Sequence, residues 1–258
     1  MATTDRDSFS ELVTSGNVTT ADVITRIPVI GQLFLIALYS ATTLLAVVGN
    51  GLAIIVFATG SRSRTSSLRH FLISLAVADL VMALFCMPFT FTMTILLDWV
   101  FSPLLCPVVL FLQTLSVTAS VATNVAIGID RYCAVVRPLR AHTSAPRRRL
   151  VIVIVWLVSA LLSSVQLFVA REQSFPDSDR KNCLELWPQP EVVFRRGYTC
   201  FLLLTNYFVP VVVLSVTYGS VCRHLRRRSR PGNRDAIRDE QQNKSTRKVS
   251  VLLCVLHR

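Results

Sequence analysis

The amino-acid sequence predicts an all-α membrane protein with five complete membrane spans and the start of a sixth. Apolar residues make up 52% of its 258 residues and charged residues only 16%, against about 25% charged residues in a typical soluble domain. The net charge of +12 is concentrated in short segments that separate long apolar runs. This distribution indicates that the apolar runs cross a lipid bilayer and that the basic segments lie at its surface.

Five runs are long enough to cross a membrane, which takes about 20 mostly apolar residues in a helix. Backbone amides inside lipid must bond to one another, so these runs are predicted to be helices, and none alternates as a barrel strand would. The expected spans are residues 31–59, 71–97, 103–136, 150–170 and 198–221.

The remaining segments complete the expected organisation. The apolar run at 249–256 is too short to cross a membrane, so residues 248–258 are predicted to begin a sixth helix. Residues 1–30 form a tail, residues 31–222 form the five helices with their loops, and residues 223–247 form an inner loop. The tail begins with Met-Ala-Thr-Thr-Asp and has no basic segment followed by an apolar one. It is therefore not expected to be a cleavable signal peptide.

Loop charge predicts the orientation of the spans. The segment after the first span carries +3, residues 130–149 carry +5 and residues 223–248 carry +7. On the other side, the first 30 residues carry −2, the next loop carries −1 and residues 171–196 carry no net charge. Basic loops face the cytoplasm, so the N-terminus is expected to be extracellular.

Two features of the outer side follow from this orientation. Asn17 begins an Asn-Val-Thr triplet in the tail, which is a glycosylation acceptor. Of the seven cysteines, only Cys106 and Cys183 are expected on the oxidising outer side. They are therefore predicted to form a disulfide that ties the loop before the fifth span to the outer end of the third.

Asp79 is the clearest polar residue inside a predicted span. An acid in the middle of an apolar helix is costly, so it needs a partner or a function. One interpretation is a hydrogen bond that packs neighbouring helices, and Asn50 of the first span is a candidate partner. The other interpretation is a buried ion or proton site.

Asp130, Arg131 and Tyr132 end the third span on the inner side. Asp130 can hold the Arg131 guanidinium from the side, and an arginine with a local partner can exchange it for another, as a two-state element does. The alternative is an arginine that simply extends from a helix end into water. Trp156 in the fourth span is interpreted as a packing residue, and Pro210 is expected to bend the fifth.

Several function classes are disfavoured by the same residues. No aromatic residues alternate with the basic ones, so nucleic acid is not expected as a partner. No spacing of Cys and His suggests a metal site. The four histidines all lie near the inner side, without a Ser/His/Asp set, so an enzyme is not expected. A transporter or channel is disfavoured because there is no inverted repeat or pair of broken helices.

Together these residues resemble the rhodopsin-like G-protein-coupled receptors, in the peptide-binding branch of the neuropeptide Y, neuropeptide FF and orexin receptors. The motifs occur in the family's order, on the sides that loop charge fixes independently. The resemblance covers roughly residues 30–256. The matching residues are Gly49 and Asn50, Leu75 to Asp79, Trp99 to Phe101, Cys106, Ser120, Asp130 to Tyr132, Trp156, Cys183, Pro210 and Tyr218.

The resemblance implies a rhodopsin-like transmembrane helix bundle in the plasma membrane whose outer half binds an extracellular neuropeptide-like ligand. Gln113 lies about two helical turns below Cys106, where amine receptors have an aspartate for the ligand ammonium. A glutamine at this position excludes that salt bridge, and in this respect the sequence resembles the peptide-binding branch of the family. Trp99 and Glu185 are the other expected ligand-binding residues, and Glu185 suits a peptide with a basic or amidated end.

The resemblance also assigns residues to signalling. Asp79 and Ser120 would supply one half of a sodium site, which is the only cofactor implied. A heterotrimeric G protein would be the inner partner, and two receptors would be able to dimerise. The residues implied in coupling and activation are Asp130, Arg131, Tyr132, Pro138, Leu139 and Tyr218.

Two departures from the family pattern bear on function. Asn124 stands where the family usually has a bulky apolar residue, and we expect it to loosen the inactive state. Residues 1–258 include neither the aromatic and proline motif of the sixth helix nor the Asn-Pro-x-x-Tyr motif of the seventh. The sequence is therefore expected to be a receptor without helices six and seven, or alternatively a non-signalling isoform that associates with full-length receptors and retains them.

Overall fold

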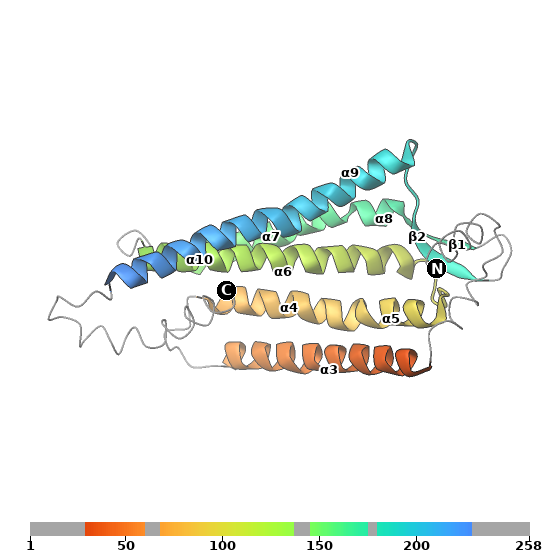
Figure 1. The fold of residues 1–258 in the computed structure, drawn as a ribbon, viewed down its shortest axis with the longest axis horizontal. Coiled ribbons are helices and arrows are strands. Elements are labelled where there is room, and N and C mark those ends of the chain that lie inside the picture. The colour runs from red at the N-terminus through yellow and green to blue at the C-terminus, as the bar shows by residue number, and fades with distance from the viewer. Residues whose placement is uncertain (1–28, 60–67, 137–144, 175–179, 229–258) are drawn as a thin grey trace, which may run out of the picture.

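The computed structural model describes residues 29–59, 68–136, 145–174 and 180–228, and Figure 1 shows their arrangement. The elements form a bundle of long helices with a small hairpin at one end. In chain order they are α3 (Val29–Thr59), α4 (Arg69–Phe85), α5 (Met87–Leu96), α6 (Leu105–Val136), α7 (Ala145–Ser163), α8 (Val165–Val169), β1 (Ala170–Ser174), β2 (Lys181–Glu185), α9 (Glu191–Leu203), the π-helical turn η2 (Leu204–Phe208) and α10 (Val209–Arg228).

Within the described residues, five helical stretches are long and apolar enough to cross a membrane. The first four begin and end within a few residues of the predicted spans. The fifth begins at Glu191 instead of residue 198. Its first two turns carry charged residues, so their low hydropathy did not predict a membrane helix. The stretches are Val29–Thr59, Arg69–Leu96, Leu105–Val136, Pro146–Val169 and Glu191–His224.

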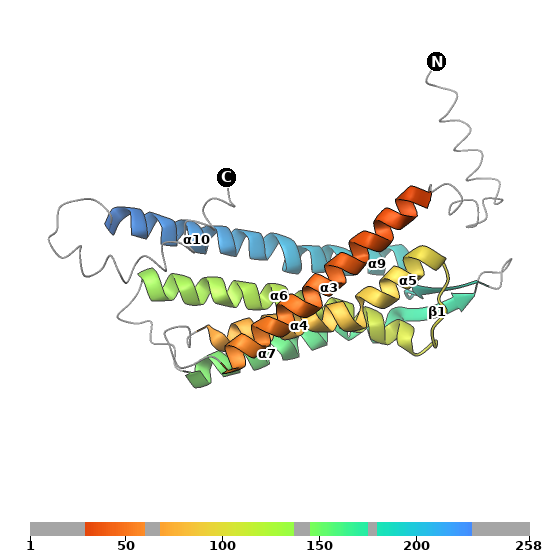
Figure 2. The same ribbon diagram turned by 90° about the horizontal axis from the view of Figure 1, so that it is seen from below.

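Helix α6 is the centre of the bundle, and α4, α7, α8 and α10 all pack against it. Its buried face is built largely of small residues, which let neighbouring helices approach closely in a membrane. Helix α3 lies at the edge, crosses α4 obliquely and buries none of its own residues (Figure 2). The apolar side chains left exposed by this arrangement suit contact with lipid tails.

Two prolines interrupt the spans. Pro88 lies in the first turn of α5, and the helix breaks just before it at Cys86, whose ψ of −49° comes with a φ of −121°. Pro210 follows the wide turn η2. Proline has no N–H and crowds the carbonyl four residues earlier, so a helix kinks or widens to accommodate it. The bend expected at Pro210 therefore takes the form of a π-helical turn.

The loop before the fifth span forms an antiparallel β-hairpin that sequence analysis did not predict. In its register Ala170 pairs with Glu185 and Glu172 with Cys183. The strand sequences Ala-Arg-Glu-Gln-Ser and Lys-Asn-Cys-Leu-Glu have no apolar alternation, so the usual signal for a strand is missing. The hairpin is instead held by its attachments to the helices beneath it.

Candidate functional sites at the two ends of the bundle

The predicted disulfide between Cys106 and Cys183 is confirmed. It joins the first turn of α6 to β2 and has a Cα–Cα distance of 5.5 Å. Both sulfurs lie in a buried cluster with Trp99, Val109 and Ala170. The bundle end that carries this disulfide and the hairpin is called the outer end below, and the opposite end is called the inner end.

A second attachment fixes the hairpin at Lys181. The Lys181 backbone N–H donates to Asp98 Oδ1 at 2.7 Å, and the Trp99 backbone N–H donates to the Lys181 carbonyl oxygen at 2.7 Å. The Lys181 ammonium pairs with Glu172 on the other strand at 2.8 Å. The hydrogen bond and the charge of Glu172 raise the pKa of Lys181. The first outer loop thus holds β2 independently of the disulfide.

The candidate ligand-binding residue Glu185 is held by two neutral donors. Gln166 Nε2 donates to one carboxylate oxygen at 2.8 Å, and Trp187 Nε1 donates to the other at 3.0 Å. The Trp187 ring packs against Tyr198 with centroids 5.4 Å apart. Gln166 is buried, and its Oε1 has no hydrogen-bond partner within the described residues. The carboxylate is therefore oriented, but the two groups that orient it do not neutralise its charge.

The other two predicted ligand-binding residues lie in different surroundings. Gln113 is half-buried on α6. Trp99 is only 3% exposed, and its ring packs beside Phe89 and Phe101. Its indole N–H donates to the Ser102 carbonyl oxygen. Trp99 therefore supports the hairpin from beneath in this structure, and direct contact with a ligand stays a prediction.

The middle of the bundle brings Asp79 and Ser120 together. Ser120 Oγ donates to Asp79 Oδ1 at 2.8 Å. The suggested Asn50–Asp79 bond is wrong, because the Asn50 amide donates instead to the Ala46 carbonyl oxygen in its own helix. A single helical turn offers that acceptor locally, and α3 lies at the edge of the bundle. The polar contact between α4 and α6 is thus made by Ser120.

Trp156 does more than pack. Its indole N–H donates to Ser74 Oγ on α4 at 3.0 Å, so it forms a hydrogen bond between helices. Sequence analysis missed this bond because both residues read as ordinary members of apolar spans. An indole N–H inside a bundle needs an acceptor, and that requirement could have indicated a partner for Trp156.

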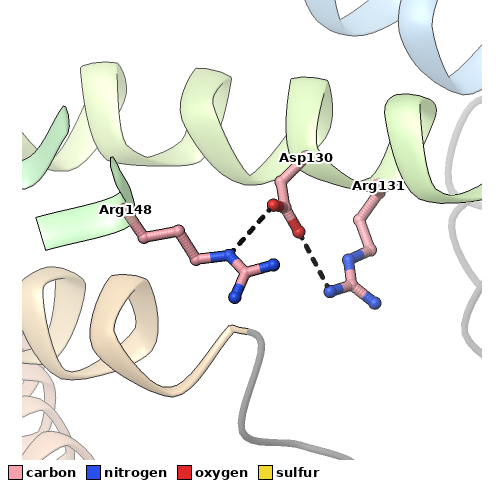
Figure 3. Close-up of polar contacts among 3 residues, drawn as sticks. All are labelled: Asp130, Arg131 and Arg148. Carbon is pink, nitrogen blue, oxygen red and sulfur yellow. Dashed lines mark hydrogen bonds and ion pairs between the residues drawn. The ribbon is translucent and has the colours of Figure 1, made fainter. Parts of the chain in front are cut away.

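At the inner end, one acid holds two arginines (Figure 3). Asp130 Oδ2 accepts from Arg131 at 3.2 Å and Oδ1 accepts from Arg148 of α7 at 3.3 Å. The Asp130 and Arg148 side chains are 9% and 12% exposed, whereas that of Arg131 is 36% exposed. The Arg131–Asp130 pair was predicted, and Arg148 was not. Arg131 is the more accessible of the two arginines.

Close packing places α10 beside this ion pair. A Cβ built on Gly128 would lie 2.7 Å from Leu214 Cδ2 and 3.9 Å from the Tyr218 ring. Tyr218 also lies within electrostatic reach of the Arg131 guanidinium. Glycine at 128 therefore permits the approach that brings Tyr218 and Arg131, two predicted activation residues, to the same end of the bundle.

Several predicted residues carry less structural information. Tyr132 is half-buried, and Asn124 is exposed on α6. Asn17, Pro138 and Leu139 lie outside the described residues, as do the tail at 1–28 and the segment 229–258. Among the described residues, no group of three or more His, Cys, Asp or Glu side chains is placed to hold a metal ion.

Comparisons with known proteins point to one family. Residues 49–257 match the model of the seven-transmembrane receptors of the rhodopsin family. The chain is 35% identical over 230 residues to the mouse (Mus musculus) neuropeptide Y receptor type 2, which covers 87% of this chain and 59% of the relative. It is 35% identical to the Xenopus laevis cholecystokinin receptor over 74% of the chain and 43% of the relative. For the pig (Sus scrofa) gastrin/cholecystokinin type B receptor the identity is 37%, over 74% and 42%.

Proposed function

Since the chain belongs to the rhodopsin family of seven-transmembrane receptors, we propose that it serves as a receptor for an extracellular peptide and acts on a heterotrimeric G protein. It is a multi-pass membrane protein of the plasma membrane, as this family is. The chain spans about 59% of the length of the neuropeptide Y receptor that it matches. That relative is named for a peptide, which supports the proposed ligand class.

The observation that carries the proposal is the oriented carboxylate of Glu185. Its two donors, Gln166 and Trp187, are neutral, so a cationic ligand group would meet an unneutralised charge. A guanidinium or ammonium beside it would form a charge-assisted hydrogen bond, which is roughly twice as strong as a neutral one. The Gln166 Oε1 atom, which has no partner, would be a second acceptor next to the carboxylate.

The surroundings of Glu185 favour a peptide over a small amine. Trp187 and Tyr198 offer aromatic faces beside it, and such faces suit both apolar and cationic side chains. Gln113 on α6 is neutral, so its amide would bond an amide or carbonyl group and would not pair with an ammonium. A peptide with a basic side chain and an amidated end supplies both kinds of group.

The middle and inner end of the bundle complete the proposal. Asp79, with Ser120 donating to it, would supply half of a sodium site. Arg131 is the more exposed partner of Asp130 and would leave it to engage the G protein, while Arg148 remains to neutralise the acid. Tyr132, Pro138 and Leu139 would flank that contact, and Tyr218 would lean toward Arg131.

The test is binding of fluorescently labelled neuropeptide Y, and of a panel of amidated basic peptides, to the chain in membranes. Glu185→Gln is expected to weaken the binding of the best peptide about 10- to 100-fold, since hydrogen bonds to charged groups contribute about 1.5–3 kcal/mol. Glu191→Gln is the matched control, because Glu191 is an exposed acid at the same end that pairs with Arg195. Equal affinity in both variants would remove Glu185 from the site. Failure of every peptide to bind the folded chain would contradict the proposed ligand class.

A further inference from the structure

Three buried polar side chains lie along one face of the fourth span. Ser159, Ser163 and Gln166 are spaced by four and three residues, which puts them on the same side of a helix. Ser164, at the junction of α7 and α8, keeps helical dihedrals (φ −59°, ψ −23°), so this spacing holds across the junction. Each of the three is no more than 4% exposed. The face that they form is therefore turned toward the bundle, where α7 and α8 both pack against α6.

Each of these side chains has a polar atom that no other described residue satisfies. The atoms are Ser159 Oγ, Ser163 Oγ and Gln166 Oε1. Hydroxyls on the neighbouring helices behave differently, since Thr114 and Thr217 each donate to the carbonyl oxygen four residues earlier. A polar group that is buried without a partner is destabilising, so buried groups of this kind are usually paired with protein or with ordered water. Three unpaired atoms on one buried face indicate a ligand that pairs with them.

The hydrogen bond to Glu185 fixes the direction of the Gln166 amide. Gln166 Nε2 donates to the Glu185 carboxylate at 2.8 Å, and only the nitrogen of an amide is able to donate. Gln166 Oε1 must therefore lie on the side of the amide that faces away from the carboxylate. Because Gln166 is buried, a donor for this oxygen has to come from inside the bundle.

Helix α6 supplies a fourth group of the same kind. Ser116 is 2% exposed, and its Oγ also has no hydrogen-bond partner in the part of the chain that the structure describes. The antiparallel helices α6 and α7 are joined at the inner end by Asp130 and Arg148. Ser116 lies 14 positions from Asp130, and Ser163 lies 15 positions from Arg148. The two serines are therefore at nearly the same depth in the bundle.

The fourth span is also interrupted at this depth. Helix α7 ends at Ser163 and α8 begins at Val165, although no proline lies between residues 147 and 174. Helices without proline kink at pairs of small residues such as Ser163 and Ser164, or where a water molecule enters the ladder of backbone hydrogen bonds. The interruption thus coincides with the unpaired hydroxyls, and a bound water accounts for both.

We propose that these four groups hold a cluster of buried water between α6 and the junction of α7 and α8. Residues three and four apart on a helix have Cβ atoms about 5–6 Å apart, which a single water molecule is able to bridge. A buried water makes about three hydrogen bonds, and the serine hydroxyls both donate and accept, whereas Gln166 Oε1 accepts only. None of the four groups is charged, so the site has nothing to offset the cost of burying an ion.

The cluster has a consequence for the outer end of the bundle. Water bonded to Gln166 Oε1 keeps the amide from turning, so Nε2 stays directed at Glu185. The water thereby helps to orient the carboxylate before a ligand arrives. This consequence rests on the proposed function of Glu185, whereas the water site itself does not.

The test is the sign of the change in unfolding temperature for Ser163→Ala, measured on the full chain in nanodiscs. Loss of the hydroxyl leaves the water and Gln166 short of a partner, so the unfolding temperature is expected to fall by about 2–4 °C. Alanine has the higher helix propensity, so the fall cannot come from the helix itself. Ser164→Ala is the matched control, because Ser164 Oγ donates to the Leu161 carbonyl oxygen at 2.7 Å and needs no water. It is expected to change the unfolding temperature less.

The opposite sign would overturn the proposal. If the Ser163 hydroxyl has no partner at all, its removal relieves a buried unpaired group, and the unfolding temperature rises or stays the same. A second measurement compares Ser159→Ala/Ser163→Ala with the two single variants. Shared water predicts that the double variant loses less than the two single losses added together, and additive losses would contradict it.

A crystal structure that resolves ordered water gives the direct result. It is expected to show water within hydrogen-bonding distance of Gln166 Oε1 and Ser163 Oγ, and a protein group in that place would overturn the site. None of these measurements uses a ligand. Failure of every peptide to bind would therefore contradict the proposed function and leave the water site standing.

Discussion

The two ends of the bundle are held together by different kinds of bond. At the outer end a disulfide, two backbone hydrogen bonds at Lys181 and a packed aromatic cluster fix the hairpin. At the inner end two arginines share the single carboxylate of Asp130. A covalent bond and hydrogen bonds to the backbone specify one arrangement. An acid that pairs with two arginines can lose one of them and still keep a partner for its own charge.

Helix α6 connects these two ends, since it carries both Cys106 and Asp130. They are 24 positions apart in the sequence, which corresponds to about 36 Å of helix. Under the proposed function, a ligand at the outer end would bind beside a fixed hairpin. Its effect on α6 would reach the inner end, where the ion pair is able to rearrange. The comparison predicts the largest effect when the disulfide of the outer end is broken, smaller effects at the inner end, and the smallest effect at the Lys181–Glu172 ion pair of the hairpin.

The largest effect is expected from Cys106→Ser. Opening a disulfide that closes a loop of 77 residues should lower the free energy of unfolding by about 4 kcal/mol. Thermal unfolding in detergent micelles measures the loss. Cys133→Ser is the control, because Cys133 is a free cysteine on the same helix and should have little effect. Equal unfolding temperatures for the two variants would show that the disulfide does not stabilise the outer end.

The next effect is expected from Gly128→Ala. The new methyl group would meet Leu214 at 2.7 Å, so α10 must shift, and overpacking of this kind costs about 2 kcal/mol. Gly219→Ala adds the same methyl group to α10 where nothing lies within 4 Å, and it should leave stability unchanged or raise it. If both variants unfolded alike, the close approach of α6 and α10 would be wrong.

A smaller loss is expected from Arg148→Gln. Asp130 would keep Arg131 but lose its inward partner, which should cost about 1.5 kcal/mol because hydrogen bonds to charged groups are strong. Arg147→Gln removes a neighbouring exposed charge and should cost much less. The comparison of the two unfolding temperatures measures the contribution of the inner ion pair. An equal cost would contradict the inward direction of Arg148.

The smallest effect concerns the ion pair of Lys181 and Glu172, in which the lysine side chain is exposed. Glu172 raises the pKa of Lys181 in the folded protein, so the stabilisation is fully present below the ordinary lysine value of 10.5. It is lost as the pH rises through the raised value. Nuclear magnetic resonance titration of the Lys181 ammonium should give a lower pKa in Glu172→Gln than in the wild type. An unchanged pKa of Lys181 would show that the two side chains do not pair in solution.

Sequence reasoning predicted what depends on composition along the chain. Apolar length gave five spans, loop charge gave their sides, and the two outer cysteines gave the disulfide. The predicted start of the fifth span lies too late in the sequence. Glu191 and Arg195 form an ion pair on the first turns of this helix, and their charges made the segment look like a loop by hydropathy. The resemblance placed Ser120 beside Asp79, and the structure brings them together.

What could not be predicted depends on contacts between distant segments. Arg148 reaches Asp130 from another helix, and neither residue type nor spacing distinguishes it from its two neighbours until the helix is seen in place. Gln166 and Glu185 meet only because the hairpin folds back over α8. Lys181 is fixed through its backbone by Asp98 and Trp99, and backbone bonds leave no trace in the sequence.

The most direct test of the comparison is residue-resolved hydrogen exchange in the variant Asp130→Asn, reconstituted in nanodiscs. The account predicts faster amide exchange at the inner ends of α6 and α7, where the shared acid has been removed. It predicts unchanged exchange at the amides of Trp99, Lys181 and Leu186, which bond within the outer end. Faster exchange at those three outer amides would show that the two ends are not held independently, and would contradict the account.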